Sequence, residues 1–65
     1  MYKNNMRVLR EKQGIRLSDL AAETDISIGY LCHLEKGTRK NPSIEIMDKI
    51  AKALNKSVSE VFFNE

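Results

Sequence analysis

The feature that most constrains the fold is the short interval between two segments with helical periodicity. Residues 17–24 carry apolar or small side chains at the spacing of one helix face, which predicts a helix there. The side chains on that face are Leu17, Leu20, Ala21 and Thr24. Residues 28–36 follow Ser27, a good N-cap residue, and precede Gly37, so they predict a second helix. Because only three residues separate the two segments, Asp25 must adopt a tight turn conformation, and the two short helices must pack across it.

A further helix is predicted before this pair, over about residues 4–13. Either Asn4 or Asn5 can cap its N-terminus, and Gly14 supplies a left-handed residue that ends it. Its inward side chains would be Met6 and Leu9.

Two more helices are predicted after the pair. Pro42 favours an extended entry and Ser43 an N-cap for the most periodic segment of the chain, which Asn55 can end in place of glycine. The apolar stripe of this helix consists of Ile44, Met47, Ile50, Ala51 and Leu54. Ser57 and Glu60 have the spacing of a capping box, which predicts a last short helix with Val58, Val61 and Phe62 as its apolar side chains. Since no useful stretch alternates with period two, the predicted fold class is all-α with five helices.

Length and composition restrict the classes of function. The 65 residues, 42% of them hydrophobic and 31% charged, predict one folded domain over residues 1–65. Such a short chain buries too little surface for a deep active-site cleft, and it lacks a catalytic constellation, so we do not expect an enzyme.

One cysteine, Cys32, and one histidine, His33, exclude a disulfide framework and a zinc site built from paired thiolates. We expect no cofactor and no small-molecule ligand, and the lack of a long apolar run or an apolar signal predicts a cytoplasmic protein without membrane contact.

Charge is distributed unevenly along the chain. The formal net charge is +2, yet Lys and Arg counted against Asp and Glu give +4 for residues 1–16 and +2 for residues 27–42. The segments between and after them carry −3 and −1. The two basic segments would form one positive surface if the fold brings them together. On charge alone, an ordinary solvated surface of mixed charge is an equally good interpretation.

The helix predicted over residues 28–36 has two distinct faces. Leu31 and Leu34 lie on one side with Tyr30 beside them, and this side would face the core. The opposite arc holds Ile28, Gly29, Cys32, His33 and Lys36, and it leads into Thr38, Arg39, Lys40 and Asn41. This arrangement joins side chains that can contact base edges to donors suited to phosphates, on an element whose width fits the major groove of DNA.

Taken one at a time, these residues also have simpler interpretations. Ile28 could contact another protein, His33 could be an ordinary surface histidine, and Cys32 could be a partly buried small hydrophobic residue. Gly29 costs about 1 kcal/mol relative to alanine inside a helix, which indicates close approach of a backbone or ligand, although an exposed glycine can also be tolerated. Because imidazole donates either as imidazolium or from one neutral nitrogen, the base preference of His33 stays open.

Residues 15–37, IRLSDLAAETDISIGYLCHLEKG, resemble the helix-turn-helix of Xre-type, lambda-repressor-like transcriptional regulators. Asn41, Pro42 and Ser43 with the apolar stripe after them resemble the fourth helix of this family, and residues 58–62 its short fifth helix. The resemblance covers residues 4–63, and the Gly-Tyr-Leu of the third helix is most similar to regulators of the sporulation and biofilm repressor type. It implies a compact five-helix, lambda-repressor-like (Cro-like) DNA-binding domain.

The resemblance also implies which residues contact double-stranded DNA. Those facing the major groove or its flanking phosphates would be Ser27, Ile28, Gly29, Tyr30 and His33. Those touching the DNA backbone would be Arg39, Lys40 and Asn41, and Lys36 and Thr38 complete the candidate surface. An ion pair between Arg10 and Glu35 would orient the first helix against the third.

Two positions depart from the family pattern. Many members carry glutamine at the start of the second helix, where it contacts a phosphate, but Leu17 leaves only its backbone N–H for an anion. The preceding N-cap is Arg16 rather than serine or threonine, which removes a cap oxygen worth about 1 kcal/mol and adds a cation near the expected DNA backbone. We therefore count Arg16 and Leu17 among the candidate DNA-binding residues.

Together these features predict a sequence-specific DNA-binding transcriptional regulator, a repressor that acts as a homodimer on a palindromic operator. Val61, Phe62 and Phe63 cannot all point into the core from one short helix, so Phe63 is a candidate dimer contact, with packing over the end of the preceding helix as the alternative. The alternative function is a protein-interaction module of the antitoxin or antagonist type, in which Leu17 and Ile28 would form an apolar patch.

Overall fold

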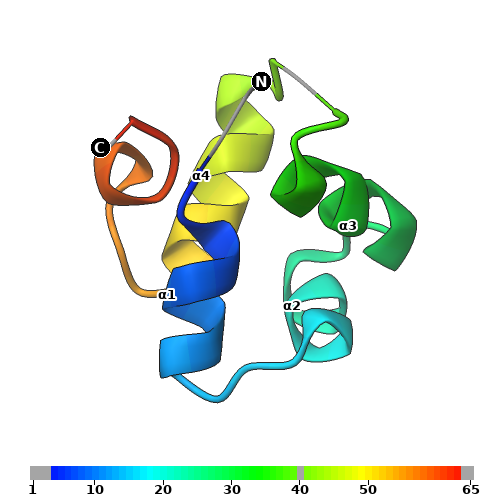
Figure 1. Cartoon of the computed structure of the whole chain (residues 1–65). Coiled ribbons are helices and arrows are strands. Elements are labelled where there is room, and N and C mark those ends of the chain that lie inside the picture. Colours follow the sequence, from blue (N-terminus) through cyan, green and yellow to red (C-terminus); the bar gives the residue numbers. More distant parts are fainter. Residues whose placement is uncertain (1–3, 40, 64–65) are drawn as a thin grey trace.

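The computed structural model describes residues 4–39 and 41–63, which form five helices around one apolar core (Figure 1). In chain order these are α1 (Met6–Lys12), α2 (Leu17–Thr24), α3 (Ile28–Lys36), α4 (Ile44–Ala53) and the π-helix η1 (Ser59–Phe63). The described residues include no strand, and the all-α prediction is confirmed. Helix α2 packs against both α3 and α4, while η1 packs against α1. None of the helices in these ranges is long and apolar enough to cross a membrane.

The turn between α2 and α3 follows the prediction, and the bounds of both helices are the predicted ones. Asp25 ends α2 in the left-handed conformation, with φ 61°. The Oγ of Ser27 accepts a hydrogen bond from the Tyr30 N–H at 3.1 Å and so caps α3. Gly37 ends α3 with φ 81°. These local signals define the length of α3 and the direction in which its outer side faces.

Helix α1 begins at Met6, two residues later than predicted. The side-chain oxygen of Asn4 accepts a hydrogen bond from the Met6 N–H at 2.9 Å, and the Asn4 amide donates to the Leu34 carbonyl at 3.0 Å. The Asn5 N–H donates to the carbonyl of Val61 at 2.8 Å. Since these two residues bond to α3 and η1, they connect α1 to its neighbours instead of extending it.

The core is formed by the apolar faces of all the helices. Its buried residues are Met6, Leu20, Leu31, Leu34, Met47, Ile50, Ala51, Leu54, Val61 and Phe62. The prediction that Ile44 belongs to this core is wrong, because Ile44 is 78% exposed. Ile44 is the first residue of α4, directly after the cap residue Ser43. Ile46, two residues further along α4, packs against the core.

Arg10 of α1 and Glu35 of α3 form the ion pair that the family resemblance implies. Arg10 Nε lies 2.8 Å from Glu35 Oε2, and Nη2 lies 3.1 Å from Oε1, while Nη1 donates to the carbonyl of Ile15 at 2.9 Å. The two side chains are only 11% and 8% exposed. The hydrogen bond to Glu35 raises the pKa of Arg10 above its ordinary value. Because this bidentate pair is largely shielded from water, it holds α3 in a defined position against α1.

The last short helix forms where predicted and has π-helical geometry. The Ser57 N–H donates to Glu60 Oε1 at 2.9 Å and the Glu60 N–H donates to Ser57 Oγ at 3.1 Å, which is the predicted capping box. Val61 and Phe62 are buried, whereas Phe63 is 62% exposed. The argument that three consecutive apolar residues cannot all face the core is thus confirmed.

The capping box makes the fold sensitive to acid at this helix. The hydrogen bond from the Ser57 backbone N–H holds the pKa of Glu60 below its ordinary value of 4.5. A carboxyl group with a lowered folded-state pKa stabilises the fold above its unfolded pKa, and this contribution disappears as the pH falls through the folded pKa. We expect Glu60→Gln to lower the Tm at neutral pH and to flatten its decline below about pH 4.5. Thermal denaturation followed by circular dichroism measures this, with Glu45→Gln in the first turn of α4 as the control; equal flattening in both variants would contradict the assignment.

Candidate nucleic-acid interface

The side of α3 that points away from the core carries five of the twelve predicted contact residues. Its exposed residues are Ser27, Ile28, Gly29, His33 and Lys36, and we call this set the outer face of α3. Ile28 is 49% exposed although it is a large apolar residue. Cys32 is only half-exposed. A single exposed apolar residue is normal on a protein surface, so Ile28 by itself does not mark a binding site.

Gly29 stands in open space on this outer face. A β-carbon built at Gly29 would have no heavy atom of a neighbouring element within 4 Å, and the backbone is ordinary α-helix. Packing and conformation of the free protein therefore do not require glycine at this position. Glycine nevertheless makes the helix about 1 kcal/mol less stable than alanine would, which is consistent with close approach of a partner outside the chain.

We expect Gly29→Ala to raise the Tm by about 4–8 °C, the shift that about 1 kcal/mol produces in a domain of this size. Gly37→Ala is the matched control, because Gly37 has φ 81° and a β-carbon is strained there. Thermal denaturation of both variants tests the expectation. A fall of the Tm in Gly29→Ala would show that the glycine serves the fold itself.

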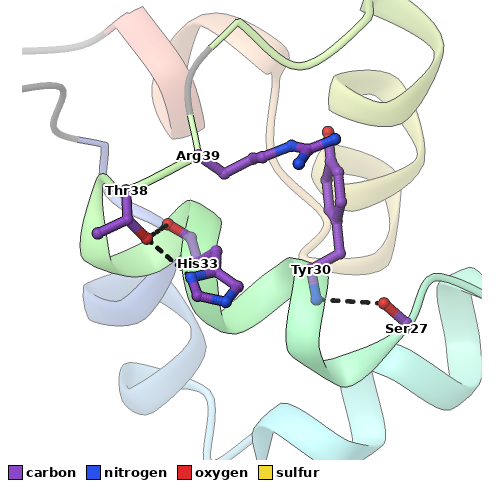
Figure 2. Close-up of a pocket in the computed structure, with 5 residues that line it drawn as sticks. All are labelled: Ser27, Tyr30, His33, Thr38 and Arg39. Atoms are coloured by element: carbon purple, nitrogen blue, oxygen red, sulfur yellow. Dashed lines mark hydrogen bonds between the residues drawn. The ribbon is translucent and has the colours of Figure 1, made fainter.

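A hollow of about 500 Å³ opens between α3 and the loop that follows it (Figure 2). It is lined by Ser27, Tyr30, His33, Thr38 and Arg39. The Nδ1 of His33 lies 2.9 Å from Thr38 Oγ1, and this hydroxyl is also 3.2 Å from the His33 carbonyl. Figure 2 shows that the other ring nitrogen, Nε2, points away from Thr38. Thr38 therefore orients the imidazole and leaves Nε2 as the edge that can meet a ligand.

Arg39 and Tyr30 form the other wall of this hollow (Figure 2). The Cζ of Arg39 lies 4.9 Å from the centroid of the Tyr30 ring, in a cation–π contact. Tyr30 itself is partly buried and packs against the core. The partly buried ring of Tyr30 therefore supports the guanidinium of Arg39.

The loop after α3 is attached to the helix by its backbone. The N–H groups of Thr38 and Arg39 both donate to the His33 carbonyl, at 3.0 and 3.1 Å. Asn41 is exposed and adopts the left-handed conformation, with φ 55°. The predicted contact Lys40 lies outside the described residues. The described part of the loop extends the outer face of α3 with polar and basic side chains.

Arg16, at the start of α2, is 81% exposed but already has a partner. Its Nε and Nη2 lie 3.1 and 3.3 Å from the two carboxylate oxygens of Asp19, which also accepts the Arg16 backbone N–H at 3.0 Å. The hydrogen bond from the Arg16 side chain holds the pKa of Asp19 below its ordinary value. Asp19 was missed in the sequence reasoning, although an acidic residue three positions after an N-cap is the signal for this bond.

Leu17 lies partly buried and packs against the core, while Ile28 stays exposed. Leu17 therefore adds less to an apolar surface patch than the protein-interaction interpretation requires. Among the described residues there is also no group of three or more His, Cys, Asp or Glu side chains that could hold a metal ion. The polar and basic side chains of this surface favour an extended anionic ligand over a small one.

Comparison with known proteins agrees with this geometry. A family model described as helix-turn-helix matches residues 6–61. The chain is 39% identical over 56 residues to the HTH-type transcriptional regulator DdrOP3 of Deinococcus deserti, covering 86% of this chain and 43% of that protein. It is 32% identical over 57 residues to the HTH-type transcriptional regulator SlrR of Bacillus subtilis, covering 88% of this chain and 38% of that protein. The chain thus spans about two fifths of the length of these two regulators.

A solved structure supplies the same comparison in three dimensions. The crystal structure of SinR, the master regulator for biofilm formation, in complex with DNA superimposes with a TM-score of 0.79 and 31% identity. The match covers 83% of this chain and 86% of that one. These relatives are transcriptional regulators, which is the class of function that the sequence predicts for this chain.

Proposed function

Because this chain belongs to the Xre-like helix-turn-helix family, we propose that it is a sequence-specific DNA-binding transcriptional repressor. The observation that carries the proposal is the outer face of α3, where Gly29 leaves open space beside an exposed Ile28 and an oriented His33. The likeness to a DNA-bound SinR supports DNA as the partner. We also propose that the protein acts in the cytoplasm, because the chromosome of bacteria such as those that carry its relatives lies there.

The proposed mechanism divides the contacts between bases and phosphates. Helix α3 enters the major groove, where Ile28 can cover a thymine methyl group and His33 can bond to a base edge through Nε2. Arg39 and Thr38 lie beside the groove, where a phosphate passes. The N-terminus of α2 with Arg16 meets the backbone on the other side of the groove, where a phosphate competes with Asp19 for the guanidinium.

We further propose that two copies bind a palindrome. One copy reads only a few base pairs, and half-sites on successive major grooves have centres about 34 Å apart. The longest dimension of the chain is 25 Å, so two copies fit side by side and their side chains can meet. Phe63, which is 62% exposed at the end of η1, is the proposed dimer contact.

Selection from a random duplex library, followed by a salt titration on the winning duplex, tests this function. We expect a palindrome with half-sites about one helical turn apart. If the dimer neutralises about six to eight phosphates, the plot of log K against log salt should have a slope of about −5 to −7. A slope near zero would contradict an electrostatic DNA contact.

The same experiment separates the alternative function. A protein-interaction module would enrich no sequence, and its partner would bind with little dependence on salt. Enrichment of a single asymmetric half-site would instead support DNA binding but contradict the proposal that two copies bind a palindrome.

A further inference from the structure

Arg39 differs from the other described arginines in the group that holds its side chain. The arginines bound to a carboxylate are Arg7, Arg10 and Arg16, whose partners are Glu11, Glu35 and Asp19. Within residues 4–39 and 41–63, no ion pair joins Arg39 to an acidic residue, and its guanidinium lies over the ring of Tyr30.

Whether the partner is a carboxylate or an aromatic ring decides which N–H donors of the guanidinium remain available for another ligand. A carboxylate binds the edge of the group and occupies its N–H donors, as Glu35 does with Nε and Nη2 of Arg10. A cation–π contact attracts the guanidinium to the ring without occupying its N–H donors as a carboxylate does. A phosphate binds through that edge, often with two parallel hydrogen bonds. Arg39 is therefore held and still able to bind an anion.

Arg39 is restrained at both ends by α3. Its backbone N–H donates to the His33 carbonyl at 3.1 Å, and its Cζ lies 4.9 Å from the centroid of the Tyr30 ring. Because Tyr30 packs against the core, the ring is a fixed support. A side chain that is ordered before binding loses less conformational freedom when it meets its ligand.

We infer that Tyr30 is a positioning residue, which holds the guanidinium of Arg39 with its edge N–H groups ready for a DNA phosphate beside the groove that α3 enters. The inference rests on the proposed function and deepens it. It assigns Tyr30 a role different from the direct DNA contact that the family resemblance implies.

A double-mutant cycle on the selected duplex tests the role. Arg39→Ala should weaken binding at least about tenfold and reduce the salt slope. Tyr30→Leu should weaken binding about threefold to fivefold with the salt slope unchanged, and Tyr30→Phe should bind like the unmodified chain, because it keeps the ring. In the Arg39→Ala background, Tyr30→Leu should have no further effect. In a Lys52→Ala background, which removes an exposed charge from α4, the effect of Tyr30→Leu should persist.

A second measurement needs no DNA. Stacking on an aromatic ring should shift the Arg39 side-chain proton resonances upfield in the unmodified chain and in Tyr30→Phe, and Tyr30→Leu should abolish the shift. An undiminished effect of Tyr30→Leu in the Arg39→Ala background, or failure of Tyr30→Phe to bind, would overturn the inference and make Tyr30 a direct contact. Failure of the unmodified chain to bind any duplex would overturn the proposed function together with it.

Discussion

Replacing Arg10 by alanine should lower the Tm by at least about 12–24 °C. The substitution leaves the carboxylate of Glu35 without its cation in a position where that side chain is only 8% exposed. Removal of one partner from a buried pair costs about 3 kcal/mol or more, and each kcal/mol corresponds to about 4–8 °C in a domain of this size. The Arg10 bond to the carbonyl of Ile15 is lost as well.

Arg7→Ala is the matched control for this experiment. Arg7 also lies on α1 and pairs with Glu11, but the two side chains are 71% and 57% exposed. Such an exposed pair contributes less than about 1 kcal/mol. A second variant, Arg10→Met with Glu35→Leu, should recover much of the stability because it leaves no unpaired buried charge. Equal small effects of Arg10→Ala and Arg7→Ala would refute the structural role of the pair.

The largest expected effect on DNA binding comes from Gly29→Glu. The open space around Gly29 accepts the new side chain without disturbing the fold, and glutamate is a better helix former than glycine, so the Tm of the variant should be at least that of the unmodified chain. On DNA, the added carboxylate would stand between the outer face of α3 and the negatively charged groove. Opposed like charges at an interface cost several kcal/mol, so we expect affinity for the selected duplex to fall at least about 100-fold.

Lys49→Gln controls for the change in net charge, since both variants lower the net charge of the chain by one unit. Lys49 is an exposed residue of α4 that borders Glu23 and Lys52, at the junction of α2 and α4. We expect it to change affinity by less than about threefold through the general field of the protein. An equal loss of affinity for the duplex in the two variants would mean that Gly29 does not lie in the DNA interface.

Much of the fold can be predicted because its signals are local. Ser27, Gly37 and Asp25 act through caps and left-handed conformations that depend on the nearest residues, and α2 and α3 have the predicted bounds. The capping box of Ser57 and Glu60 is equally local. The Arg10 pair could not be derived from spacing, because it joins residues 25 positions apart, and it was expected only from the family resemblance.

The parts that sequence reasoning missed depend on where side chains meet in space. Periodicity places Ile44 on the core stripe, but Ile44 is the first residue of α4 and is exposed, whereas Ile46 and Met47 contact the core. The position of Arg39 over Tyr30 depends on how the loop returns along α3. Asp19 stands three positions after the N-cap residue Arg16 and accepts its backbone N–H, a bond that replaces the cap oxygen that arginine lacks. The role of the predicted residues in DNA binding therefore stays a prediction, and the partners that orient the side chains of His33, Arg39 and Arg16 are visible only in the structure.

Mapping the contact surface by NMR tests the central claim most directly. The amide resonances of the isotope-labelled chain would be followed during titration with the selected duplex. The account predicts that the largest changes lie at residues 27–39 and at the start of α2, while the exposed residues Lys49 and Lys52 of α4 stay unchanged. The largest changes on that side of α4, with residues 27–39 unaffected, would contradict α3 as the DNA-binding element.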